Sequence, residues 1–533
     1  MTDRDDEREP LDESQEFDDP SPIPDGEQPR EHRPAPEELA VEAEAEASGD
    51  IASDVTLTDR EAAANEAAER GRRGERRDLV RWGLRALAGA AAAALGVGAV
   101  LAAGAVPDTA RVETEPPSSI VQPASPLQTR VCAGPALRIG TADGEDALAV
   151  AALAEPELAL GSRGGEVEQR RVEIAGSAAA GDDAVPGGEV VVQRDEESAL
   201  SAAQALELDS EAVRGFAASE CAEPRLEQWL VGGSTRTGRQ AVLTIANASD
   251  VSASVDVTVY GAEGPVPSVG STGIAVLGGS EVALDLAAIA PDVPDVVVQV
   301  TAVGAPVAAH LQQVTTRGLE RGGFEVIDPV PALGSAVLPG VTVSEPTGLE
   351  TQEGYDDTVP VLRLLSPSGG PVRIVFQSED GSTIESAGSL EAGRVTDFPL
   401  EELPVGTLAI RVEADAPVVA GARTVAIAGA GLDLDWVAGG QPRSGASAVA
   451  VPPGPGATLH IVSAADEAQE ITVDGETVQL AAGGVHEQPV EGGSVEVAGE
   501  QLVLGVAYRS DSEVGGFTAS PPGPAAAGVR VLH

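Results

Sequence analysis

The clearest strand in this chain is Val255-Asp256-Val257-Thr258-Val259-Tyr260, in which apolar and polar side chains alternate. A period of two is typical of a strand with one buried face and one solvated face. Similar short runs occur at residues 372–376, 408–412 and 470–473, and the last is followed by an Asp-Gly turn signal. From about residue 127 onward, the chain is therefore predicted to be mainly β, with many short strands and regular turns.

Motifs recur along this β region at intervals of roughly 100 residues, the size of one immunoglobulin-like sandwich. Trp-Leu-Val-Gly-Gly at 229–233 returns as Trp-Val-Ala-Gly-Gly at 436–440, and a related run lies at 337–341. Ala-Pro-Val at 305–307 and at 416–418 is expected near the end of a unit. Two alternatives stay open: chance similarity among Val-rich and Gly-rich strands, and large propeller blades that close on each other.

We accordingly predict a row of four tandem immunoglobulin-like β-sandwich units. Their predicted ranges are 128–226, 227–328, 329–434 and 435–533.

Residues 86–106 form an uncharged apolar run that is long enough to span a bilayer as a helix. Six arginines lie in the basic juxtamembrane segment 71–85, which predicts that the N-terminal side stays in the cytoplasm. A buried Ala-rich helix and a cleaved signal ending at 103–105 are the alternatives. We expect a retained transmembrane helix whose partner is membrane lipid, and a body outside the cytoplasm.

The segments on either side of this helix have biased compositions. Residues 1–70 combine acidic runs with scattered prolines and few large apolar side chains, so we predict a disordered acidic cytoplasmic tail. Residues 107–127 contain five prolines and are predicted to be an extended Pro-rich linker.

The charge of the chain excludes several functions. The formal net charge is −53, which repels nucleic acid and gives no support to DNA or RNA binding. The chain contains no lysine, so Schiff-base and P-loop lysine chemistry is excluded. Aromatic residues make up 2% of the chain, so the core must be built from Val, Leu, Ile and Ala.

Cys132 and Cys221 are the two cysteines of the chain, and both lie on the outer side of the predicted membrane helix. A structural disulfide between them is expected where disulfides persist, with free thiols as the alternative. A catalytic cysteine would need a histidine base, and the five histidines show neither that pairing nor a zinc-ligand spacing. The histidines are His32, His310, His460, His486 and His533.

Other chemistries have weak signals. The acidic clusters at 355–357, 378–381 and 433–435 do not match a calcium-binding loop, and we interpret them as turns or solvated faces. His460 is likewise expected at a solvent-facing strand position, whereas Trp229 and Trp436 are expected in the core. The chain lacks the G-x-S-x-G nucleophile motif. A carboxylate pair for glycoside hydrolysis stays open, because any two acids could meet in the fold.

The order of membrane helix, Pro-rich linker, Cys132, Cys221, the Trp-Leu-Val-Gly-Gly run and tandem units resembles an uncharacterised family. Its members are membrane-anchored envelope proteins of GC-rich Gram-positive bacteria, known as a domain of unknown function. The resemblance covers roughly residues 80–533. It implies a β-sandwich body outside the membrane, and it supplies no activity and no site residues.

These observations predict a single-pass, non-catalytic scaffold or interaction protein of the cell envelope, with an envelope protein as partner and no cofactor or metal. One alternative is a signalling protein whose acidic tail binds a cytoplasmic regulator. Another is a carboxylate-based glycan-processing enzyme.

Overall fold

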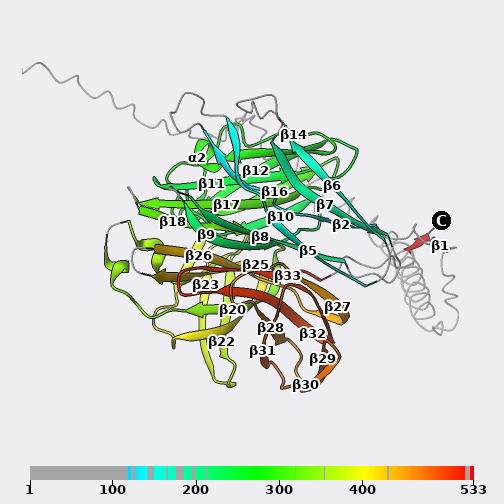
Figure 1. Cartoon of the computed structure of the whole chain (residues 1–533), viewed down its shortest axis with the longest axis vertical. Helices are drawn as coiled ribbons and strands as arrows, with labels where there is room; N and C mark the ends of the chain where they lie inside the picture. Colours follow the sequence, from blue (N-terminus) through cyan, green and yellow to red (C-terminus); the bar gives the residue numbers. More distant parts are fainter. Residues whose placement is uncertain are drawn as a thin grey trace, which may run out of the picture. The chain divides into compact units, whose positions relative to one another are not determined.

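The computed structural model describes most of the chain from Leu127 to Pro521. The described ranges are 127–140, 149–163, 166–175, 185–194, 200–210, 213–317, 320–352, 354–428 and 431–521. The strands β1 (Ser118–Val121) and β34 (Val529–Leu532) are also described and pair with each other in antiparallel fashion. β1 lies inside the predicted Pro-rich linker. The fold is mainly β, built of several curled sheets (Figure 1).

The strands from β2 to β33 fall into four consecutive groups, which we call repeats 1 to 4. Repeat 1 contains β2 (Leu127–Val131), β3 (Ala136–Ile139), β4 (Val150–Ala154), β5 (Glu157–Ser162), β6 (Val167–Ile174), β7 (Pro186–Arg194), β8 (Leu200–Asp209) and β9 (Arg214–Glu220). Repeat 2 contains β10 (Glu227–Val231), β11 (Arg239–Ala246), β12 (Ala253–Gly261), β13 (Gly264–Pro265), β14 (Ile274–Val276), β15 (Ser280–Asp285), α2 (Leu286–Ile289), β16 (Val297–Val303), β17 (Ala308–Arg317) and β18 (Glu320–Ile327).

The second half of the chain is divided in the same way, after the short connecting strand β19 (Pro329–Val330). Repeat 3 contains β20 (Leu333–Val343), the 3-10 turns η2 (Leu349–Thr351) and η3 (Asp356–Thr358), β21 (Val361–Leu365), β22 (Gly370–Ser378), β23 (Thr383–Leu390), β24 (Val395–Pro399), β25 (Gly406–Ala428) and β26 (Gly431–Ala438). Repeat 4 contains β27 (Arg443–Val451), β28 (Thr458–Ser463), β29 (Gln469–Val473), β30 (Glu476–Leu480), β31 (Val485–Pro489), β32 (Gly493–Arg509) and β33 (Val514–Ala519).

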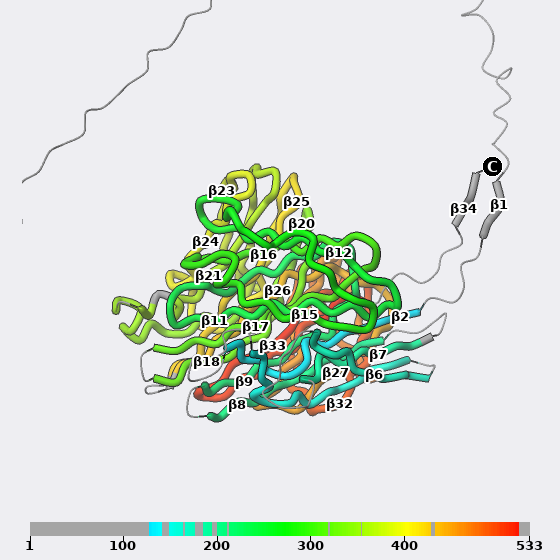
Figure 2. Tube along the Cα trace, turned by 90° about the horizontal axis from the view of Figure 1, so that it is seen from above, coloured from blue at the N-terminus to red at the C-terminus, as the bar shows by residue number. Residues whose placement is uncertain are grey.

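One pairing scheme recurs in all four repeats. In repeat 3, β20 and β22 pair with the first half of the long strand β25, whereas β21 and β26 pair with its second half. Repeat 4 has the same arrangement around β32. In repeats 1 and 2, two successive strands replace the long one, β7 with β8 and β16 with β17. β2, β7 and β6 of repeat 1 lie side by side in Figure 2.

The Ala-Pro-Val motifs mark the place where the chain crosses between the two halves of a repeat. Pro306 lies between β16 and β17, and Pro417 lies in the middle of β25. Gln501 takes this place in β32, with a left-handed φ of 49°. A proline donates no N–H to a ladder, so it suits a point where a strand leaves one set of neighbours for another. The motifs therefore lie within the repeats and not at their ends.

The last strand of each repeat lies on the inside. β9 packs against β18, β18 against β26, β26 against β33, and β33 returns to β9. β27 of repeat 4 also packs against β5 and β8 of repeat 1. The repeats therefore close on one another, and the predicted row of units is wrong in this respect. The pairings do not by themselves establish immunoglobulin-like sandwiches.

Trp229 and Trp436 are both buried, as predicted for core residues. They do not occupy equivalent strands, however, because Trp229 is on β10, the first strand of repeat 2, and Trp436 is on β26, the last strand of repeat 3. The predicted boundary between residues 434 and 435 consequently falls inside β26. The boundaries predicted at 226/227 and 328/329 fall between strands, whereas the one predicted at 127/128 falls inside β2. Val, Leu, Ile and Ala make up most of the buried side chains.

Within the described part of the chain, no helix has the length and apolar composition needed to cross a membrane. The predicted transmembrane helix 86–106, the tail 1–70 and the basic segment 71–85 lie outside the described residues.

Candidate functional site

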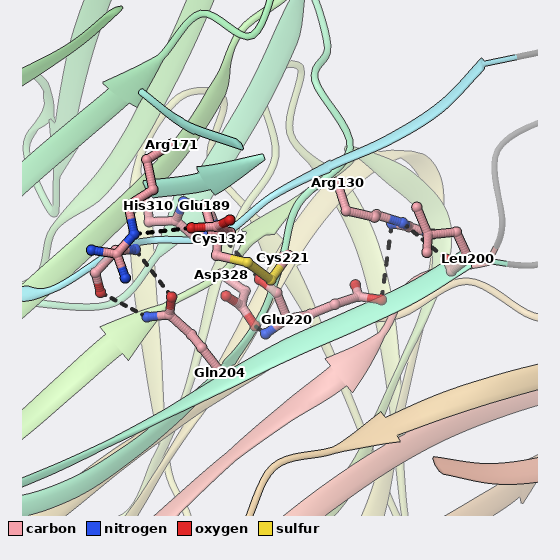
Figure 3. The surroundings of a disulfide bond; sticks show 11 residues. Arg130, Cys132, Arg171, Glu189, Leu200, Gln204, Glu220, Cys221, His310 and Asp328 are labelled. Atoms are coloured by element: carbon pink, nitrogen blue, oxygen red, sulfur yellow. Dashed lines mark hydrogen bonds and ion pairs between the residues drawn. A yellow bond between two sulfur atoms is a disulfide. The ribbon is translucent and has the colours of Figure 1, made fainter. Parts of the chain in front are cut away.

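The disulfide lies at the end of the inner strand of repeat 1. Cys132 follows β2 and Cys221 follows β9, and the structure joins them covalently, as the sequence predicted (Figure 3). Both residues are buried. The bond therefore ties the first strand of repeat 1 to its last.

Two buried carboxyl groups next to this disulfide link three repeats (Figure 3). Asp328, just after β18, accepts a hydrogen bond from the backbone N–H of Glu220 on β9 at 2.9 Å. The Glu220 side chain accepts one from the N–H of Ser520, just after β33, at 2.8 Å. Burial raises the pKa of Asp328 well above its usual range. Each acid thus accepts a hydrogen bond from a backbone N–H group of a neighbouring repeat.

A second pair of buried acids lies between repeats 2 and 3. Glu325 on β18 accepts a hydrogen bond from the N–H of Trp436 at 3.1 Å, and it also bonds to the side chain of Asp435 on β26. Burial raises the pKa of both carboxyls, and for Glu325 the neighbouring charge of Asp435 adds to this effect. Two carboxyls can bond to each other directly when one carries a proton, so this arrangement favours the protonated form of one member of the pair.

Asp433 on β26 is the acid that contacts all three other repeats. Its carboxylate accepts hydrogen bonds from the N–H of Phe216 on β9 at 3.0 Å, Val514 on β33 at 3.1 Å and Phe324 on β18 at 3.3 Å. Burial raises its pKa well above the usual range, and these backbone donors oppose the shift. Asp433 therefore supplies the hydrogen-bond acceptor for backbone N–H groups of the inner strands that have no β-ladder partner at this point.

Glycine makes room for this carboxylate. A Cβ at Gly215 would lie 2.5 Å from Asp433 Oδ1, and a Cβ at Gly323 would lie 2.6 Å from the same atom. Any side chain at either position would displace the carboxylate or the strand that carries it.

A small cavity opens where the inner strands end. Glu220, Asp328, Gly440 and Thr518 are among its lining residues, so all four repeats contribute. Its volume is about 40 Å³. A buried water needs roughly 10–15 Å³ by this measure, whereas ligand pockets occupy about 300–1,000 Å³. The cavity is thus the size of a few waters and too small for a metabolite.

Two buried arginines lie close to the acids of this cavity. Nη1 of the buried Arg130 lies 3.9 Å from Glu220 Oε1. Burial lowers the pKa of Arg443 to about 10, and the charge of Glu220 opposes that shift. Among the described residues, no group of three or more His, Cys, Asp or Glu side chains could hold a metal ion. The junction of the inner strands therefore has the features of a structural polar core.

The histidines lie apart from one another. His310 is buried with Nε2 3.4 Å from the carbonyl oxygen of Glu220, and burial lowers its pKa to about 4. His460 was predicted to face solvent, which is wrong: it is 4% exposed, with Nδ1 3.4 Å from Glu487. His486 lies on β31, partly buried. His32 and His533 lie outside the described residues.

The predicted acidic turns have different outcomes. Asp380 does lie in the exposed turn between β22 and β23, where it accepts a hydrogen bond from the N–H of Ser382. The same interpretation is wrong for Asp433 and Asp435, which are buried in β26. Their alternation with apolar residues suggested a solvated face, but a neighbouring repeat covers that face. Asp357 is also buried, paired with two arginines.

A sequence signal for the inner strands went unrecognised. Gly-Phe occurs at residues 215–216, 323–324 and 516–517, in each case on the last strand of a repeat. Asp433-Leu434 takes the corresponding place in repeat 3. Aligning these dipeptides would have identified the inner strands and marked Asp433 as the exception among glycines.

The fold and this junction define a protein of four β repeats that close around buried carboxyl groups. Residues 176–497 match the model of a family of unknown function, DUF5719, and the chain belongs to that family. No curated protein and no solved structure gave a match.

Proposed function

We propose that this protein is a non-catalytic scaffold or interaction protein of the cell envelope. In this proposal residues 86–106 anchor it in the membrane, its body lies outside the cytoplasm, and each repeat is a variant of an immunoglobulin-like sandwich. The origin in GC-rich Gram-positive bacteria belongs to the same proposal.

The observation that best supports a non-catalytic protein is what the carboxyl groups with shifted pKa values bind. Strongly shifted pKa values often mark active sites, but structural networks shift them as well. Asp328, Glu325 and Asp433 are buried, and each accepts a hydrogen bond from the backbone of another repeat. Groups engaged in this way stabilise the assembly of repeats and are not accessible to a polymeric substrate.

The edge strand β23 supports a role in protein interaction. Seven of its eight residues are exposed, and among the described strands it pairs with β22 alone. An exposed edge offers unpaired N–H and C=O groups to which an extended segment of another protein can add as a strand. We therefore assign the contact with an envelope partner to β23.

Site-directed crosslinking in living cells tests this proposal. A photoreactive residue replaces Ser386 on β23 in the full-length chain, and the matched control carries it at Val269, which is 93% exposed in a loop. We expect extracytoplasmic envelope proteins, identified by mass spectrometry, to be captured from Ser386 and not from Val269. Equal capture from both positions, or none from Ser386, would contradict the assignment.

The same experiment on a chain lacking residues 2–70 separates scaffold from signalling. The scaffold proposal predicts the same captured proteins with and without the tail. A cytoplasmic regulator that is captured by the full-length chain and lost with the tail would instead favour signalling.

An acidic cleft gives the glycan-enzyme alternative a definite test. The cleft has a volume of about 570 Å³ and lies between repeats 1 and 4. The acids that line it are Glu155, Glu157, Glu207, Asp209 and Glu513. Hydrolysis of cell-wall polymer by the full-length protein, abolished in Glu207→Gln, would overturn the non-catalytic proposal.

A further inference from the structure

Repeat 1 contains an element that the other repeats lack. Between its first strand, β2, and its second, β5, the chain forms the hairpin of β3 and β4. In repeats 2 and 4 the corresponding connection contains no strand. The hairpin is thus an addition to the pairing scheme that the repeats share.

The hairpin is fixed firmly against repeat 2. The side chain of Gln312 on β17 accepts a hydrogen bond from the N–H of Leu137 at 2.8 Å and donates one to the carbonyl of Pro135 at 2.8 Å. Gln240 on β11 donates to the carbonyl of Ile139 at 2.9 Å. The hairpin therefore forms a rigid wall beside β11 and β17.

A pocket lies between this wall and repeat 2. Its volume is about 480 Å³, within the range of roughly 300–1,000 Å³ that small-molecule sites occupy. We call it the hairpin pocket, and its lining residues are Arg138, Leu153, Ser210, Val213, Gly238, Arg239, Gln240, Val314 and Thr316. Leu153, Val213 and Val314 make its surface largely aliphatic.

Arg138 is a charged residue that lines the hairpin pocket. Among the described residues, its buried Nε atom has no hydrogen-bond partner. Arg239, in contrast, pairs with Asp357 at 2.9 Å and donates to the carbonyl of Gly354. A guanidinium that lines a largely aliphatic pocket, in a chain of net charge −53, is suited to a ligand that carries its own negative charge.

We propose that the hairpin pocket binds a small amphipathic anion. A carboxylate or phosphate head bonds to Arg138, and an aliphatic body of several methylene groups contacts Leu153, Val213 and Val314. This inference is independent of the scaffold proposal, because it concerns different repeats and a ligand of a different class.

Equilibrium dialysis of the full-length protein in zwitterionic nanodiscs, with empty nanodiscs as background, tests this site. The probes are radiolabelled octanoate, butyrate, octanol and octyl phosphate. Octanoate should bind more tightly than butyrate, because each buried methylene strengthens binding up to about fourfold. Octanol, which lacks the charge, should bind about tenfold more weakly than octanoate. Comparing the affinity for octanoate with that for octyl phosphate shows whether the site prefers a carboxylate or a phosphate head.

Two variants and a control make the test specific. Arg138→Gln removes the charge and should weaken octanoate binding about tenfold while leaving octanol unchanged. Val314→Phe fills the pocket and should weaken both probes. Arg163→Gln, on an exposed arginine that pairs with Glu496, should change neither. Thermal unfolding confirms that each variant is folded.

Two results would overturn the proposal. One is the absence of saturable octanoate binding up to millimolar concentration in the folded protein. The other is binding that Arg138→Gln and Val314→Phe leave unchanged.

Discussion

Single residues connect the repeats, and Asp433 connects its own repeat to all three others. Glycine takes the corresponding place in the Gly-Phe dipeptides of the other three repeats, and at Gly215 and Gly323 the absence of a side chain leaves room for the Asp433 carboxylate. Buried backbone donors without a partner are costly, and three of them depend on this side chain.

Asp433→Ala should destabilise the protein strongly. The substitution leaves the N–H groups of Phe216, Phe324 and Val514 without their acceptor, and each unsatisfied donor costs about 1–3 kcal/mol. We expect a loss of at least about 3 kcal/mol in the free energy of unfolding measured with urea. Asp380→Ala, in an exposed turn, should cost less than about 1 kcal/mol. Equal losses for the two variants would show that Asp433 has no special role.

Glu281 should make stability fall as the pH rises. It is buried on β15 and accepts a hydrogen bond from the N–H of Gly188 at 2.7 Å, and burial raises its pKa from 4.5 to about 7. Between these values the unfolded chain has lost the proton while the folded chain retains it. The contribution to stability is therefore complete below pH 4.5 and declines by about 3 kcal/mol toward pH 7.

The variant Glu281→Gln separates this contribution to stability from that of His310. The lowered pKa of His310 makes stability rise with pH, in the opposite direction. Urea unfolding of both proteins across pH 4.5–8 should show the glutamine variant gaining on the native chain as the pH rises. A difference between Glu281→Gln and the native chain that stays constant across this pH range would contradict the prediction.

Sequence reasoning succeeded at residues whose chemistry limits the choices. Two cysteines can form one intramolecular bond, and a tryptophan is most often buried in a β core. It failed at His460, Asp433 and Asp435 because a period of two assigns alternate residues to solvent. That rule assumes one uncovered face, and here neighbouring strands cover both.

Among the elements, one long strand organises repeats 3 and 4, and two successive strands take its place in repeats 1 and 2. The long strand serves both halves, and the Ala-Pro-Val motif lies at the crossing in β25. The sequence correctly singled out this motif as recurrent but placed it near the end of a unit, because local patterns do not show which ladder a strand joins. Strand content was easier to predict, since alternation is a local property.

The disulfide should stabilise repeat 1 through its connection of β2 and β9. Cys132 and Cys221 are 89 residues apart, and the chain-entropy model gives about 4–5 kcal/mol for a loop of that length. Replacing both residues by serine should therefore lower the free energy of unfolding by a few kcal/mol. The native protein with a reductant in the denaturant should show a similar loss, and a loss confined to the serine variant would indicate damaged packing instead.

At the scale of the whole molecule, the repeats form a closed arrangement and not a row. Repetition at a fixed period predicts how many units there are, but it does not show whether the last unit contacts the first. Here the contact of β9 with β33, and of β5 and β8 with β27, joins the two ends of the repeat series. The carboxyl groups that link the repeats depend on this closure, since Glu220 accepts from Ser520 and Asp433 from Val514.

Removal of repeat 4 should consequently unfold distant parts of the chain. A chain that ends at residue 442 loses the partners of Phe216, Ala203 and Ala159, which share one apolar cluster with residues of β27, β28 and β32. Hydrogen exchange should then show loss of amide protection in β9 of repeat 1 as well as in β26. A chain that begins at residue 115 is the control, because residues 115–533 form one compact unit, and it should keep the native pattern. Independent sandwiches in a row would behave differently: β9, more than 200 residues from the cut, would stay protected, and that result would refute the closed arrangement.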